Sequence, residues 1–78
     1  MSSRTSAQLT WHYEHGVWAA QGLTDSYRVE PTGLISDWFS VMCYDHYGTP
    51  RRRGTARGAA AAKAIAKTWE HAASVRGN

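Results

Sequence analysis

Several protein classes are excluded by patterns that this sequence does not contain. It has one cysteine, Cys43, so it can form neither an internal disulfide nor a cysteine-based zinc site, which favours a reducing compartment. No apolar run approaches the roughly 18 residues that a membrane span needs, and the polar start of the chain does not predict a signal peptide. We therefore expect a cytoplasmic protein with no membrane partner.

Catalytic patterns are also absent. Serine, histidine and aspartate occur, but neither a nucleophile motif nor a glycine-rich phosphate loop is present. His12 and His15 are spaced like metal ligands, but a strand followed by a turn points them apart and no third ligand follows. Cys43 lies among apolar neighbours, where a thiol is usually inert packing. We predict no catalytic residue, no metal site, no cofactor and no enzymatic activity.

The length of the chain limits it to one small domain. A domain of 78 residues buries only about 60% of the surface of its unfolded chain, which allows one thin core. A hydrophobic content of 42% with 19% charged residues is typical of a folded chain rather than a disordered one. We expect residues 1–8 to form a disordered tail and residues 9–76 to form a single domain.

Alternating apolar residues predict two β-hairpins. Trp11 and Tyr13 alternate with polar residues, and the following His15-Gly16 is typical of a two-residue turn that returns Trp18 opposite Tyr13. A second pair of strands is predicted over residues 27–30 and 38–45. The last of these strands is apolar on both faces, so it is central in the sheet or meets something outside the monomer.

The end of the sequence predicts one alanine-rich helix from Gly58 to about Ser74. Its expected sheet-facing residues are Ala61, Ala62, Ile65, Trp69 and Ala72, and its expected outer residues are Lys63, Lys67, Glu70 and Ser74. Together the elements predict an α+β fold: a four-stranded antiparallel sheet of two β-hairpins with one C-terminal helix packed on one face.

Charge is distributed unevenly along the chain. The first 50 residues hold two basic and five acidic side chains, a net charge of −3, whereas the last 28 hold seven basic and one acidic, a net of +6. Residues 47–57 predict a basic loop before the helix, where guanidinium groups and free backbone amides together bind anions well. A solvated, solubilising surface is the alternative. The predicted partner- or phosphate-binding residues are Arg51, Arg52, Arg53, Arg57, Lys63 and Lys67.

Aromatic residues are too numerous for one thin core, since the chain has four tryptophans and four tyrosines. If the helix covers Phe39 and Val41, the other face of that strand stays uncovered. Tryptophan, tyrosine and methionine are enriched at protein interfaces, and aromatic rings also stack on unpaired bases. Burial in a homodimer is a third interpretation, so we expect a monomer or a homodimer. The predicted exposed contact residues are Trp38, Met42, Tyr44 and Tyr47.

Two segments resemble known families. Arg51–Lys67 resembles the closing segment of a double-stranded RNA-binding domain, a family that also begins with a helix which residues 1–10 do not predict. Gly58–Ala64 is similar to a stretch in small type I-F anti-CRISPR proteins, and the whole chain resembles small accessory proteins of phages and prophages. This second resemblance implies a phage-type inhibitor in the cytoplasm of a bacterial host cell.

We therefore expect a non-catalytic binding protein. As the second resemblance implies, it docks on a host protein or ribonucleoprotein complex that handles nucleic acid, such as a CRISPR effector. The alternative is a domain that binds RNA or DNA directly through the basic loop and the helix.

Overall fold

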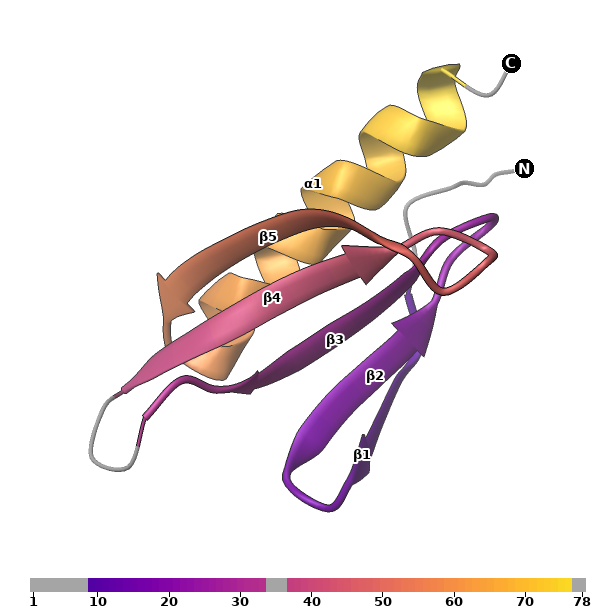
Figure 1. The fold of residues 1–78 in the computed structure, drawn as a ribbon. Coiled ribbons are helices and arrows are strands. Elements are labelled where there is room, and N and C mark those ends of the chain that lie inside the picture. The colour runs from indigo at the N-terminus through magenta and orange to yellow at the C-terminus, as the bar shows by residue number, and fades with distance from the viewer. Residues whose placement is uncertain (1–8, 34–36, 77–78) are drawn as a thin grey trace.

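The computed structural model describes residues 9–33 and 37–76, with side chains described up to residue 73. The expected tail, residues 1–8, lies outside the described residues. Within them the chain forms five strands and one helix (Figure 1). The strands are β1 (Trp11–Glu14), β2 (Val17–Gln21), β3 (Ser26–Pro31), β4 (Trp38–Tyr44) and β5 (Pro50–Arg57), and the helix is α1 (Ala59–Arg76).

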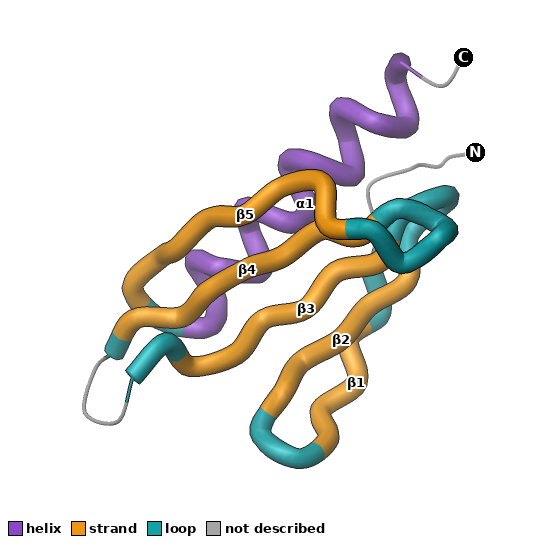
Figure 2. Tube along the Cα trace, viewed as in Figure 1, coloured by secondary structure: helices purple, strands orange, loops and turns teal. Residues whose placement is uncertain are grey.

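The strands form one antiparallel sheet in which each strand pairs with its neighbours in sequence, in the order β1-β2-β3-β4-β5. Helix α1 packs across one face, against β3, β4 and β5. Figure 2 shows the helix behind the sheet and the opposite face of the sheet turned toward the viewer. The predicted α+β class is confirmed, but the sheet has five strands rather than the predicted four.

The first hairpin has the register that the sequence predicts. Tyr13 pairs with Trp18, and the centroids of their rings lie 4.7 Å apart. The turn residues His15 and Gly16 have φ angles of 54° and 80°, in the left-handed region that a two-residue hairpin turn requires. The predicted hairpin is confirmed by this register and turn. It was predictable because the turn residues and the alternating aromatic residues favour the same pairing.

The additional strand, β5, is the segment that the sequence predicted as a basic loop. Its positions facing α1 include Gly54 and Ala56, which are too small to produce the apolar alternation of a typical strand. A Cβ at Gly54 would lie 3.6 Å from the ring of Trp69, so this side chain of α1 packs directly on the β5 backbone here. All four arginines of this segment are therefore part of the sheet, and only Arg57 lies near the start of α1.

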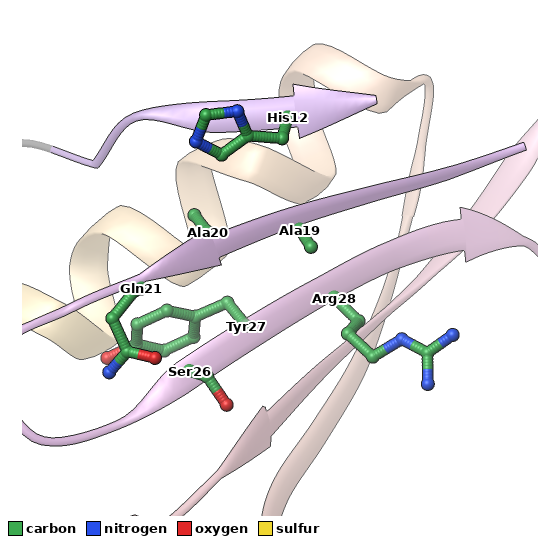
Figure 3. A pocket seen from close by; sticks show the side chains of 7 residues that line it. All are labelled: His12, Ala19, Ala20, Gln21, Ser26, Tyr27 and Arg28. Carbon is green, nitrogen blue, oxygen red and sulfur yellow. The ribbon is translucent and has the colours of Figure 1, made fainter. Parts of the chain in front are cut away.

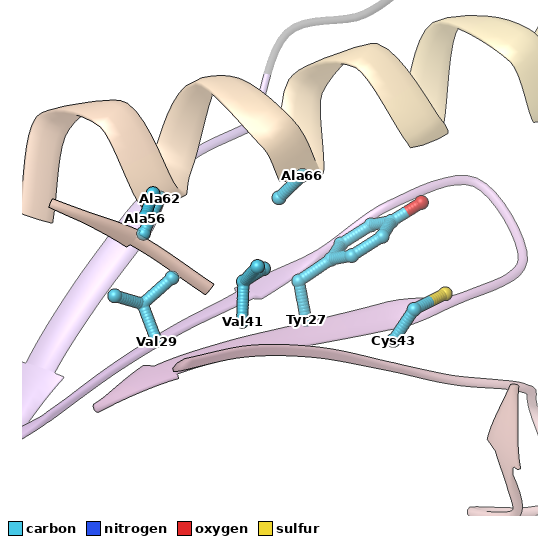
Figure 4. Close-up of a cluster of buried hydrophobic side chains, with 7 residues drawn as sticks. All are labelled: Tyr27, Val29, Val41, Cys43, Ala56, Ala62 and Ala66. Carbon is cyan, nitrogen blue, oxygen red and sulfur yellow. The ribbon is translucent and has the colours of Figure 1, made fainter. Parts of the chain in front are cut away.

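The core lies between α1 and the centre of the sheet (Figure 4). The small side chains of α1 let the helix axis come close to the sheet. The sheet-facing stripe is rotated relative to the prediction, since Ala61 and Ala72 are exposed while Ala66 is buried. The buried cluster consists of Tyr27, Val29, Val41, Cys43, Ala56, Ala62 and Ala66.

One charged side chain of α1, Glu70, is also buried. The prediction that it faces solvent is wrong, because its carboxylate accepts hydrogen bonds from the Tyr27 hydroxyl at 2.7 Å and from the Leu23 backbone N–H at 2.9 Å. Burial and, second, the hydrogen bond to Glu70 raise the pKa of Tyr27 far above its usual value, so the hydroxyl keeps its proton. The carboxylate therefore ties the C-terminal half of α1 to β3 and to the preceding loop.

Candidate functional site

The face of the sheet opposite α1 carries several of the predicted contact residues. Residues directly paired across antiparallel strands share a face, and Val29, Val41 and Ala56 mark the face beneath α1. Their neighbours along each strand therefore point the other way. We call this side the uncovered face, and over β3 to β5 it comprises Ser26, Arg28, Glu30, Trp38, Ser40, Met42, Tyr44, Arg53, Thr55 and Arg57.

The uncovered face joins two residue sets that the sequence treated separately. Met42 lies between Arg28 of β3 and Arg53 of β5, and Trp38 lies opposite Arg57. Directly opposed residues have Cβ atoms about 4.5–5.5 Å apart, so each of these arginine side chains begins next to an apolar or aromatic side chain. The Trp38 side chain is 47% exposed. Arginine, methionine and tryptophan therefore alternate over one surface.

Carboxylates share this surface with the arginines. Glu30 lies on the uncovered face of β3, and Asp37 directly precedes β4. The Asp37 carboxylate lies 4.0 Å from the Arg57 guanidinium, with both side chains exposed, and such a pair contributes little to stability. Among the described residues, no carboxylate lies within ion-pair distance of Arg28 or Arg53. The surface thus has mixed charge, with two guanidinium groups available to a partner.

Arg51 has a structural partner instead. Its guanidinium lies 3.5 Å from the carboxylate of buried Asp25, and the Cys43 thiol donates a hydrogen bond to the same oxygen at 3.5 Å. Burial and the Asp25 charge raise the pKa of Cys43 to about 11, so the thiol stays protonated at neutral pH. Arg52 is paired with Cys43, on the α1 side of the sheet. Arg51 and Arg52 therefore do not form one cluster with Arg53 and Arg57.

The two lysines of α1 lie on the opposite side of the sheet from the uncovered face. The Lys63 ammonium is 3.3 Å from the centroid of the Trp18 ring and 5.7 Å from that of Trp11, an arrangement typical of a cation–π interaction. Lys63 is half-buried, although the sequence predicted it on the outer face, and Lys67 is exposed. The structure therefore places Lys63 and Lys67 on the other side of the sheet from Arg53 and Arg57.

Tyr47 lies outside β4, apart from the other predicted contact residues Trp38, Met42 and Tyr44. It belongs to the turn between β4 and β5, is 82% exposed, and its ring centroid lies 4.0 Å from that of His46. The Asp45 carboxylate accepts hydrogen bonds from the backbone N–H groups of Tyr47 and Thr49, both at 2.9 Å, which hold the turn and lower the pKa of Asp45. Met42 and Tyr44 are half-buried on β4.

A shallow hollow of about 340 Å³ opens beside Arg28 (Figure 3). Ala19 of β2 has His12 and Arg28 as its cross-strand partners, so a small side chain separates two larger ones. Arg28 is not among the contact residues predicted from the sequence, although its position in the alternating β3 segment places it on the polar face. The hollow is lined by His12, Ala19, Ala20, Gln21, Ser26, Tyr27 and Arg28.

Other kinds of site find no support in the part of the chain that the structure describes. There, no group of histidine, cysteine, aspartate and glutamate side chains is arranged to hold a metal ion. No helix in residues 9–33 and 37–76 combines the length and apolar character needed to cross a membrane. No protein-family model, curated protein or solved structure matches the chain. Functional inference therefore depends on the geometry of the uncovered face.

Proposed function

We propose that this protein is a non-catalytic binding protein that docks on another protein through its uncovered face. The observation that carries the proposal is the alternation of Arg28, Met42 and Arg53 across three neighbouring strands, with Trp38 beside Arg57. Tryptophan, methionine and arginine are enriched in protein interfaces, where tryptophan and arginine supply most of the hot spots. A rigid sheet also holds these side chains in place before binding, which reduces the entropy lost on association.

The charges of this face favour a protein as the partner. Glu30 and Asp37 lie among the arginines, and they would repel the phosphates of a nucleic acid laid across the same surface. A protein surface can present cationic groups to these carboxylates and anionic groups to Arg28 and Arg53. Complementary charges of both signs increase specificity and the association rate.

The partner that we propose is a nucleic-acid-handling complex of a bacterial host, either a protein or a ribonucleoprotein assembly. The resemblance of Gly58–Ala64 to anti-CRISPR proteins supports this choice and implies an inhibitor that acts in the host cytoplasm. Such an inhibitor needs no catalytic chemistry, because occupying a surface that the complex requires is sufficient.

Direct binding of RNA or DNA is the second candidate. Aromatic side chains on an open sheet can stack on unpaired bases while arginines contact the backbone, as in single-strand binding proteins. The proximity of Trp38 to Arg57, and of Met42 to Arg28 and Arg53, is the observation that favours it.

Affinity capture from a bacterial lysate, with and without nuclease treatment, separates the two candidates. The variant Trp38→Ala/Met42→Ala removes the apolar part of the uncovered face, and Tyr13→Ala is the control because Tyr13 is 61% exposed on the other side of the sheet. We expect a defined protein partner that survives nuclease, is lost with the double variant and is retained by Tyr13→Ala. A partner lost with the nuclease would support the second candidate. Retention by the double variant would contradict both.

A further inference from the structure

The outer edge of β5 is unpaired in the described structure. β5, of eight residues, is the last strand of the sheet and pairs with β4 on one side only. Seven of these residues are exposed or half-exposed, including Arg53, Thr55 and Arg57. An exposed edge strand of this length is a template for pairing with a further strand.

The hydrogen-bond pattern identifies the backbone groups that this edge presents. The Gly58 N–H donates a hydrogen bond to the Asp37 carbonyl at 2.8 Å. A bond at this position shows that the adjacent pair, Trp38 and Arg57, is a non-hydrogen-bonded pair of the antiparallel ladder. Bonded and non-bonded pairs alternate along an antiparallel ladder, so every second residue of β5 directs its N–H and C=O away from β4. These residues are Arg53, Thr55 and Arg57, whose side chains also lie on the uncovered face.

Charge determines which strand fits this edge. A second copy of β5 paired antiparallel around Thr55 would place Arg53 opposite Arg57 of the other copy, and like charges directly opposite each other are destabilising. Arg53 has no carboxylate within ion-pair distance among the described residues, and the Arg57–Asp37 pair is long and exposed. An incoming strand with carboxylates at these two positions would neutralise both guanidinium groups.

We propose that the partner adds an extended acidic segment to β5 as a sixth strand. This inference rests on the proposed function and specifies the chemistry of the partner at the rim of the uncovered face. The incoming main chain hydrogen-bonds to Arg53, Thr55 and Arg57, and its acidic side chains are four residues apart so that they face Arg53 and Arg57 on the same side of the sheet. The added strand extends the uncovered face beyond β5.

The test uses the ¹⁵N-labelled full chain and a synthetic peptide, acetyl-Thr-Glu-Val-Thr-Val-Glu-Thr-amide, with a control peptide in which both glutamates are lysines. Amide hydrogen exchange is measured residue by residue. In the free protein, we expect fast exchange at Arg53, Thr55 and Arg57 and slow exchange at Gly54 and Ala56, which bond to β4. The acidic peptide should slow exchange at the first three positions at least about tenfold at saturation, and the lysine peptide should not.

Thr55→Pro removes the central outward N–H without removing a bond to β4, and Thr55→Ala is the matched control. We expect Thr55→Pro to weaken binding of the acidic peptide at least about tenfold and Thr55→Ala to leave it unchanged. The ¹⁵N spectrum shows whether each variant is folded. If Thr55→Pro does not fold, hydrogen exchange in the unmodified chain still tests the inference. Equal binding by the two variants, equal binding of the two peptides, or dimerisation through β5 in sedimentation would each overturn the inference.

The same variants keep this inference separate from the proposed function. If Thr55→Pro retains the captured partner while Trp38→Ala/Met42→Ala loses it, docking on the uncovered face is supported and strand addition is wrong. If only Thr55→Pro loses the partner, strand addition is supported and docking on the uncovered face is wrong.

Discussion

Replacing Tyr27 with phenylalanine tests the buried hydrogen bonds that hold α1 on the sheet. Tyr27 is fully buried and Glu70 is 2% exposed, so neither group can exchange its partner for water. Tyr27→Phe removes the 2.7 Å bond and leaves the Glu70 carboxylate with the Leu23 N–H. A hydrogen bond to a charged group contributes about 1.5–3 kcal/mol, and a chain of this length has a total stability of about 4–12 kcal/mol. We expect the free energy of unfolding to fall by about 1.5–3 kcal/mol.

The assay is guanidinium denaturation followed by tryptophan fluorescence, because Trp69 and Trp18 report on the helix–sheet layer. Glu70→Leu provides the second arm of a double-mutant cycle. It leaves the Tyr27 hydroxyl and the Leu23 N–H without an acceptor, at a cost of about 2–5 kcal/mol. In the Glu70→Leu background, Tyr27→Phe should be nearly neutral or stabilising, since the hydroxyl no longer has a partner.

The cycle has a clear contrary outcome. If Tyr27→Phe costs the same with and without Glu70, the two side chains are not coupled. The account of a carboxylate that holds α1 to β3 and the preceding loop would then be wrong.

Ala62→Trp should lower stability by about 1–3 kcal/mol in chemical denaturation, because Ala62 is buried between α1 and the sheet. Ala61→Trp, on the exposed side of the helix, should change stability by less than about 0.5 kcal/mol. Equal effects of the two substitutions would contradict the observed helix face. Lys63→Ala should lower stability by about 0.5–1 kcal/mol in thermal melts, because the contact with the Trp18 ring is lost. Lys67→Ala should leave stability unchanged, since Lys67 is exposed. If both variants are neutral, the cation–π interaction of Lys63 does not contribute to stability. Because burial raises the pKa of Cys43 from 9.0 to about 11, the folded state holds the thiol proton more tightly than the unfolded state does. The resulting contribution to stability is complete below pH 9 and is lost as the pH rises to about 11, a fall of about 3 kcal/mol. Cys43→Ala should abolish this fall in denaturation measured at stepwise pH, and parallel pH profiles of the two proteins would refute the prediction.

The strands with apolar alternation were predictable from the sequence. The His15-Gly16 turn and the aromatic spacing were sufficient to give the register of Tyr13 and Trp18. β5 was missed for a physical reason, since its helix-facing residues Gly54 and Ala56 are small and the Trp69 ring of α1 lies directly against Gly54. A strand that packs through its backbone leaves little hydrophobic signal.

The orientation of α1 and the composition of the candidate site depended on tertiary contacts. Alanines occur around much of the helix, so they provide little contrast between its faces, and Ala66 could not be distinguished from Ala61. Glu70 was expected outside because the residues that satisfy it, Tyr27 and Leu23, are more than 40 positions away in the sequence. The sequence identified the arginines as candidate contact residues, but their division between two sides of the sheet required the strand register.

The position of α1 after all five strands has a consequence during synthesis on the ribosome. A hairpin forms within about 10 μs, whereas adding the 18 residues of α1 takes about 1–4 s at typical translation rates. Until α1 is synthesised, the helix-facing side of a nascent sheet would leave Val29 and Val41 exposed to water. Exposed apolar surface of this kind favours association between chains. During that interval the arginines of β5 would act as gatekeepers, because their charge opposes the pairing of one nascent edge with another.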